Sequence, residues 1–115
     1  MTELGLVRER FLRDPVPTRI GGLAANLGRI RSFTSAGSAP KVIESIIDES
    51  KHLIEWTAPD TDVTIAEPLV ELQVELARWQ CTWDRLQADP EGRRRLAQAA
   101  GEWSDRLLAM SGLLP

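Results

Sequence analysis

Apolar residues recur at alternating spacings of three and four along the segment from residue 69 to residue 86. The residues concerned are Leu69, Leu72, Leu76, Trp79, Trp83 and Leu86. On a helix this spacing keeps one apolar seam on one side through five turns, so the segment has to pack against other helices. The pattern predicts one long helix that continues to about Ala88.

Prolines and small polar residues divide the rest of the chain into pieces of helical length. Two prolines at 15 and 17 separate a first short helix from a second, which ends in a Gly- and Pro-containing segment at 35–40. Asp89 and Pro90 have the residue types of an N-cap and a first helical position, which indicates a helix start. The expected helices span about 3–13, 18–34 and 41–56, a fourth that begins near a Thr64–Glu67 capping box and ends near 88, and a last one that follows Asp89.

Four long helices with short connections favour antiparallel neighbours. A chain of 115 residues corresponds to one domain, here 1–115, and its sequence contains no strand-like alternation and no internal repeat. The fold class that we predict is therefore all-α, an antiparallel up-down bundle of four long helices plus a short N-terminal helix.

Composition indicates a cytoplasmic domain. The single cysteine, Cys81, cannot form an internal disulfide, and we expect it to be a thiol in the core. Residues 1–13 lack the apolar centre of a signal peptide, and no segment approaches the roughly twenty apolar residues that span a bilayer. We therefore expect no membrane contact.

Two helices carry a second strip beside their apolar seam. On the second helix the strip consists of small residues, which are Gly21, Ala25, Gly28, Ser32 and Ser35. Small side chains let another backbone approach closely, either inside the same bundle or in a second copy of the chain. On the fourth helix Val70, Val74, Ala77 and Cys81 form a comparable strip, so this helix lies between two neighbours or presents the strip to a partner.

Charge is distributed unevenly along the chain. Residues 1–41 carry seven Lys or Arg against three acids, and residues 42–75 carry nine acids against one Lys. Arg93, Arg94 and Arg95 lie in the first turns of the last helix, where cations oppose the helix dipole. We expect this cluster to pair with the acidic third helix or with an acidic protein partner.

Nucleic-acid binding is not favoured. It would need Arg19, Arg29 and Arg31 to extend the arginine cluster, together with aromatic residues that stack on bases. The chain has no tyrosine and a net charge of −3. We therefore expect no nucleic-acid partner.

Residues for catalysis or metal binding are few. Glu49 and His52 have the Glu-x-x-His spacing of di-iron bundles, but the chain has no second histidine, and His52 is expected to face solvent. We therefore predict no catalytic residue, no metal ligand and no cofactor. Trp56 lies away from the core face of its helix, where it either packs under the following loop or contacts a partner.

These patterns favour a non-enzymatic accessory, adaptor or assembly protein that acts through helical interfaces, with a protein partner or as a homodimer. The partner-binding residues that we predict are Trp56, Arg93, Arg94, Arg95, Gly21, Ala25 and Gly28. The alternative is a bundle that binds a small molecule or pigment in a pocket between Trp79, Trp83 and Trp103.

Overall fold

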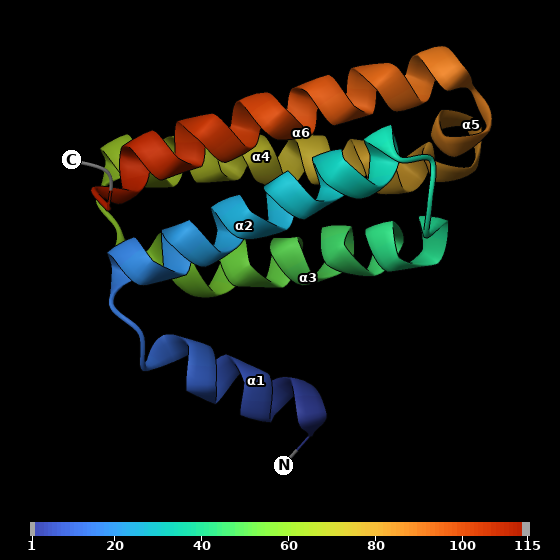
Figure 1. Ribbon diagram of the computed structural model, residues 1–115. Coiled ribbons are helices and arrows are strands. Elements are labelled where there is room, and N and C mark those ends of the chain that lie inside the picture. The colour runs from blue at the N-terminus through green and yellow to red at the C-terminus, as the bar shows by residue number, and fades with distance from the viewer. Residues whose placement is uncertain (1, 114–115) are drawn as a thin grey trace.

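The computed structural model describes residues 2–113, which form six α-helices and one 3-10 turn (Figure 1). The elements are α1 (Glu3–Leu12), α2 (Val16–Ser35), α3 (Pro40–Thr57), η1 (Ala58–Asp60), α4 (Val63–Cys81), α5 (Trp83–Ala88) and α6 (Pro90–Ser111). The four long helices run in alternating directions as a bundle, and α1 projects from it (Figure 1). The predicted all-α bundle with a short N-terminal helix is confirmed.

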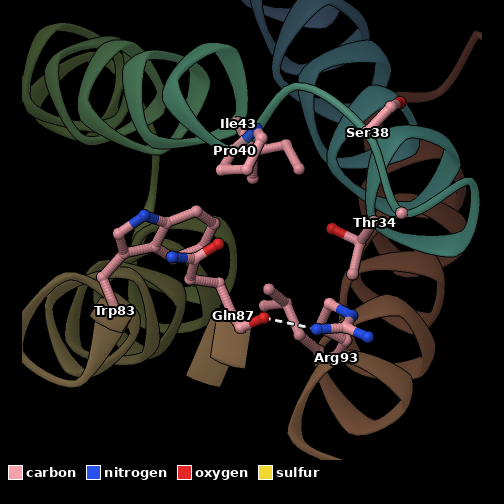
Figure 2. Close-up of a pocket in the computed structure, with 9 residues that line it drawn as sticks. Thr34, Ser38, Pro40, Ile43, Trp83, Gln87 and Arg93 are labelled. Carbon is pink, nitrogen blue, oxygen red and sulfur yellow. Dashed lines mark hydrogen bonds between the residues drawn. The ribbon is translucent and has the colours of Figure 1, made fainter. Parts of the chain in front are cut away.

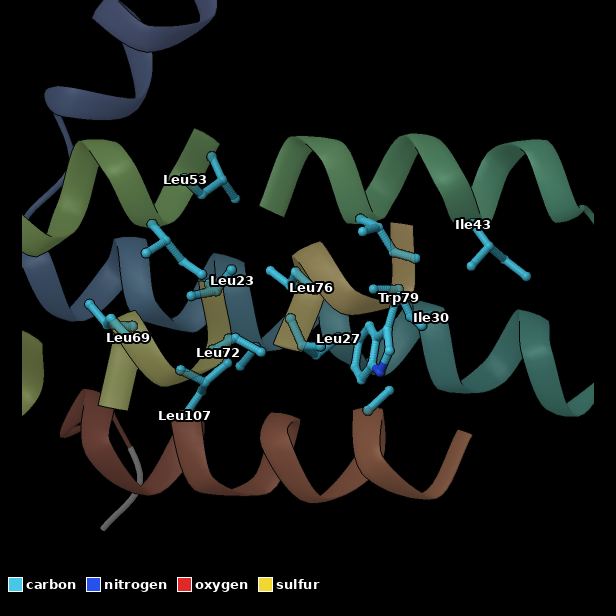
Figure 3. Packing of buried hydrophobic residues seen from close by; sticks show 14 of the residues in the cluster. Leu23, Leu27, Ile30, Ile43, Leu53, Leu69, Leu72, Leu76, Trp79 and Leu107 are labelled. Carbon is cyan, nitrogen blue, oxygen red and sulfur yellow. The ribbon is translucent and has the colours of Figure 1, made fainter. Parts of the chain in front are cut away.

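The core lies between α2, α3, α4 and α6. Side chains from all four helices meet there, as Figure 3 shows for Leu23 and Leu27 of α2, Leu53 of α3, Leu72 of α4 and Leu107 of α6. The predicted ladder supplies the contribution of α4, because Leu69, Leu72 and Leu76 are fully buried and Trp79 nearly so. The spacing of apolar residues thus identified the inner side of this helix correctly.

The ladder is carried by two helices, which corrects the prediction of one. At Thr82 the backbone leaves the helical conformation, with φ −111° and ψ 15°, and the Thr82 hydroxyl donates a hydrogen bond to the Arg78 carbonyl at 2.8 Å. Such a side-chain bond competes with the helical ladder of the backbone. Trp83 nevertheless stays buried, because the short α5 continues the apolar side.

Helix starts follow the capping rules, with one correction. The Asp89 carboxylate accepts from the amides of Glu91 and Gly92, which confirms the predicted start of α6. In α4 the cap is Asp62 rather than Thr64, because the Asp62 carboxylate accepts from the Thr64 amide at 3.0 Å and from the next amide along the chain. Both helices therefore begin at an aspartate that satisfies first-turn donors.

Arg19 joins three parts of the chain at the end of the bundle where α1 projects. Its side chain is buried and forms an ion pair with Asp60 of η1 at 2.8 Å. The same guanidinium donates to the Asp14 carbonyl at 2.8 Å and the Leu12 carbonyl at 3.3 Å, next to the link between α1 and α2. Arg19 is therefore a buried structural residue and is not available to extend a surface cluster of arginines.

Candidate protein-interaction surface

The side of α4 opposite the core carries an apolar strip on the surface. We call it the outer strip and define it as Val63, Glu67, Val70, Val74, Ala77 and Cys81. Val63 is 73% exposed, Val70 56% and Val74 48%. At 100° per residue these three valines point about 125–165° away from the Leu69/Leu72/Leu76 face. The strip thus repeats the three-and-four spacing of a packing seam on a side of α4 that faces solvent.

A groove runs along one edge of the outer strip, between α4 and α6. Trp103 of α6 lines the groove on the side away from the strip. The volume of the groove is about 700 Å³. The Arg106 guanidinium lies 4.7 Å from the centre of the Trp103 ring and pairs with Glu71 of α4 at 3.4 Å. The groove therefore has an apolar floor and a rim with both signs of charge.

The predicted position of α4 and the predicted burial of Cys81 need correction. Helix α2 is the central helix, because it packs extensively against both α6 and α3. Helix α4 packs mainly against α3. Cys81 is exposed, since it lies on the outer strip, a side of α4 that residues 2–113 leave open to solvent. The sequence allowed this strip either to pack against a helix of the same chain or to face a partner. The first of these possibilities is wrong.

The small-residue strip of α2 faces its own chain at two of its positions. A methyl group at Gly28 would lie 3.5 Å from the Ser104 hydroxyl of α6, and one at Gly21 would lie 2.7 Å from the Leu113 side chain. Ala25 is exposed instead, beside a cleft that α2 and α3 share with α1. Both positions therefore face residues of the same chain, at short range for Gly21 and at ordinary contact distance for Gly28.

The three adjacent arginines point in different directions. Arg94 and Arg95 are exposed and lie 2.5 Å and 4.0 Å from the Glu91 carboxylate of the same helix. Arg93 is half-buried and donates to the Gln87 carbonyl. The expected pairing with α3 is wrong, because a glutamate one turn away on α6 is the nearer carboxylate.

Trp56 is partly covered by α1. Its ring lies 5.9 Å from Phe11 of α1 and stacks on His52 at 5.7 Å. This contact with α1 is one that the sequence did not predict. The exposed surface of α1 is mixed, since Leu4, Leu6 and Val7 face solvent together with four charged residues.

The remaining tryptophans occupy separate places. Trp79 belongs to the core (Figure 3). Trp83 lines a small cavity beside α5, and Trp103 lines the groove at the outer strip. Trp83 and Trp103 therefore contribute to two different pockets.

Ionisable side chains form surface pairs rather than a reactive cluster. His52 lies 3.7 Å from Asp48 and 3.5 Å from Glu55 on its own helix. Within residues 2–113 no group of three or more His, Cys, Asp or Glu side chains is placed to hold a metal ion. The hydrogen bond from the Thr64 hydroxyl, with help from two backbone amides, lowers the pKa of Asp62 below its ordinary 3.8.

Sequence reasoning found part of the outer strip and missed the rest. The sequence pattern identified Val70, Val74, Ala77 and Cys81, but Val63 and Glu67 were not included. Their signal was available, because they extend the same spacing by two positions toward the N-terminus of α4.

In the part of the chain described, no helix has both the length and the apolar character needed to cross a lipid bilayer. No family model, no curated protein and no solved structure matches this chain.

Proposed function

We propose that this chain is a non-enzymatic assembly protein that acts as an antiparallel homodimer through the outer strip of α4. The observation that carries the proposal is the exposure of Val63, Val70 and Val74 on one line opposite the core. Large exposed apolar surfaces mark interaction sites, and these three valines align on one side of α4, with Glu67 between Val63 and Val70. A helical partner would cover the three valines together, whereas the helices of the bundle leave them exposed.

The outer strip is complementary to a second copy of itself. When two α4 helices pack antiparallel with Val70 facing the partner's Val74, the two-fold axis repeats that contact. The same register brings Glu67 opposite the partner's Arg78, because both residues lie on the same edge of the strip. Two valine contacts and two pairs of opposite charge therefore form at once. Complementary charge of this kind selects register and orientation.

The first test compares two valines of equal exposure. Val74 on α4 and Val42 on α3 are both 48% exposed. We expect light scattering at about 100 µM to give a dimer for the wild type, a concentration at which micromolar interfaces are populated. Val74→Glu should shift the protein to monomer, because it buries an unpaired charge, and Val42→Glu should leave the dimer intact. A monomeric wild type would contradict the proposal.

Charge reversal tests the register. Arg78→Glu places like charges opposite each other at both ends of the interface and should weaken the dimer about tenfold or more. Adding Glu67→Arg to that variant restores opposite charges, and we expect the dimer to return. If the double variant dimerises no better than Arg78→Glu alone, the proposed register is wrong.

Disulfide formation tests the orientation. In the proposed register residue 63 faces the partner's Cys81, whereas the two Cys81 side chains lie about 27 Å apart along the helices, at 1.5 Å per residue. Val63→Cys should therefore form a covalent dimer on mild oxidation. The wild type and the double variant Val63→Cys, Cys81→Ser should not. Rapid cross-linking of the wild type would instead indicate a parallel arrangement.

A further inference from the structure

A small cavity lies between the end of α2, the α2–α3 loop, α5 and the start of α6 (Figure 2). Its volume is about 180 Å³, close to that of apolar protein cavities of about 150 Å³ that hold benzene. Ile43, Trp83 and Leu96 form apolar walls and are each more than nine-tenths buried. The cavity therefore has room and apolar surface for a body of about six to ten non-hydrogen atoms.

A buried hydroxyl points into this cavity without a partner. Thr34 is only 5% exposed, and its Oγ1 makes no hydrogen bond within residues 2–113. Figure 2 shows this oxygen turned toward the middle of the cavity. Hydroxyls in helices commonly donate to the carbonyl four residues earlier, as Ser50 does to Ile46 at 2.7 Å. Thr34 does not, so its donor is available to a group inside the cavity.

One cation lines the cavity. Arg93 is the single charged residue of its lining, and among the residues described it takes part in no ion pair, unlike Arg94 and Arg95. Its guanidinium uses one donor on the Gln87 carbonyl (Figure 2). A guanidinium has five N–H donors arranged to hold a carboxylate with two parallel hydrogen bonds.

Helix α3 adds to the positive potential. Its first residues lie at the cavity, and its N-cap, Ala39, provides no side-chain acceptor for the first-turn amides. The N-terminal end of a helix dipole favours a negative charge nearby. The C-terminal ends of α2 and α5 also lie at the cavity and favour a positive charge, so the preference for a carboxylate rests on Arg93 and Thr34.

We infer that the cavity binds a small monocarboxylate with a compact apolar body, of about the size of benzoate. The carboxylate accepts from Arg93 and Thr34, and the ring or short chain contacts Trp83, Ile43 and Leu96. A single guanidinium neutralises one negative charge, which favours a monoanion over a phosphate or a dicarboxylate. This site is independent of the outer strip on α4.

Amide and indole NMR spectra of the full chain, titrated with benzoate, test the inference. We expect shifts to concentrate on the Trp83 indole and on residues 34–43. Benzyl alcohol has the same ring and no charge, and it should bind about tenfold more weakly or worse. Benzoate that moves no cavity resonance up to about 10 mM, or benzyl alcohol that binds equally well, would overturn the inference.

Two matched variants separate the cavity from general surface charge. Arg93→Gln and Arg94→Gln remove the same charge from the same helix, but only Arg93 lines the cavity. We expect Arg93→Gln to weaken benzoate binding about tenfold or more, and Arg94→Gln to change it by less than about twofold. Thr34→Val should also weaken binding. Equal losses in the two arginine variants would overturn the inference, and the comparison with benzyl alcohol decides the matter if Arg93→Gln fails to fold.

Discussion

The Ser104 hydroxyl of α6 donates a hydrogen bond to the Ala24 carbonyl of α2 at 2.8 Å. A short serine side chain can reach the backbone of a neighbouring helix only where the two helices come close together. A small residue at position 28, one turn further along α2, leaves room for this approach, because even a methyl group there would lie at ordinary contact distance from Ser104. The bond therefore marks the closest helix pair of the bundle, and the small residues of α2 explain its position.

Substitutions at Gly28 should depend steeply on size. A methyl group there lies at ordinary contact distance from Ser104, 3.5 Å away, so Gly28→Ala should be neutral or stabilising by up to about 1 kcal/mol through helix propensity. Gly28→Leu should lower the free energy of unfolding by about 1–3 kcal/mol, because it separates α2 from α6. Urea unfolding measures both effects.

Gly22 provides the control for Gly28. It lies on the same helix, and a methyl group there would have nothing within 4 Å. Gly22→Leu should therefore raise stability slightly through helix propensity alone. If Gly22→Leu and Gly28→Leu destabilise the protein equally, close packing between α2 and α6 does not explain the small residue at 28.

The sequence predicted inward-facing residues better than outward-facing ones. Spacing alone identified Leu69, Leu72 and Leu76 as core, because a helix has one inner side and apolar residues fill it. Spacing does not reveal what covers the other sides, and for this reason Cys81 was expected in the core although it is exposed. The break at Thr82 was also missed, since a side-chain bond to the backbone leaves the apolar pattern unchanged.

The three adjacent arginines do not form one surface, and the reason is geometric. Neighbouring residues on a helix point 100° apart, so three adjacent arginines cannot share one direction. Arg93 precedes the buried Leu96 by three residues, and this spacing places it on the inner side. The cavity that it lines is formed where residues 34–43 meet α5 and the start of α6, and this meeting could not be predicted from local patterns.

Loss of Arg19 should destabilise the protein more than loss of its ion-pair partner. Arg19 is buried and serves carbonyl groups as well as Asp60, whereas the Asp60 side chain is 52% exposed. We expect Arg19→Leu to lower the free energy of unfolding by about 2–3 kcal/mol, because the carbonyls lose a charged donor. Asp60→Asn should cost less than about 1 kcal/mol, because exposed ion pairs contribute little. Urea unfolding of both variants checks the order, and equal losses would contradict it.

Asp62 should make part of the stability depend on pH. Its pKa is lowered in the folded protein, first by the hydrogen bond from the Thr64 hydroxyl. Folding therefore favours the carboxylate form, and this contribution is fully present above pH 3.8, the ordinary value. It is lost as pH falls below that value and through the lowered pKa.

The variant Asp62→Asn isolates this contribution. It keeps an oxygen acceptor at the cap but carries no charge at any pH. We expect its melting temperature to lie below that of the wild type at pH 7 and the difference to shrink as pH falls below about 3.8. Thermal unfolding followed by circular dichroism measures the difference, and a gap that stays constant down to pH 2 would count against the prediction.

Removal of two buried hydroxyls, one at a time, should change the free energy of unfolding in opposite directions. The Ser50 hydroxyl is fully buried, donates to Ile46 and accepts from Asn26 at 3.2 Å. Ser50→Ala should lower the free energy of unfolding by about 1–2 kcal/mol, because it leaves Asn26 with one partner fewer. Thr34→Val replaces an unpartnered hydroxyl with a methyl group of the same shape, so it should raise stability by about 1 kcal/mol.

The proposed binding role of Thr34 explains why a destabilising hydroxyl can be useful there. A donor without a partner in the folded chain lowers stability, but it is ready to bind a carboxylate. Thr34→Val should therefore melt about 4 °C higher than the wild type and bind benzoate more weakly in the same buffer. If Thr34→Val instead loses stability as Ser50→Ala does, the Thr34 hydroxyl has a partner in solution and is not available for a ligand.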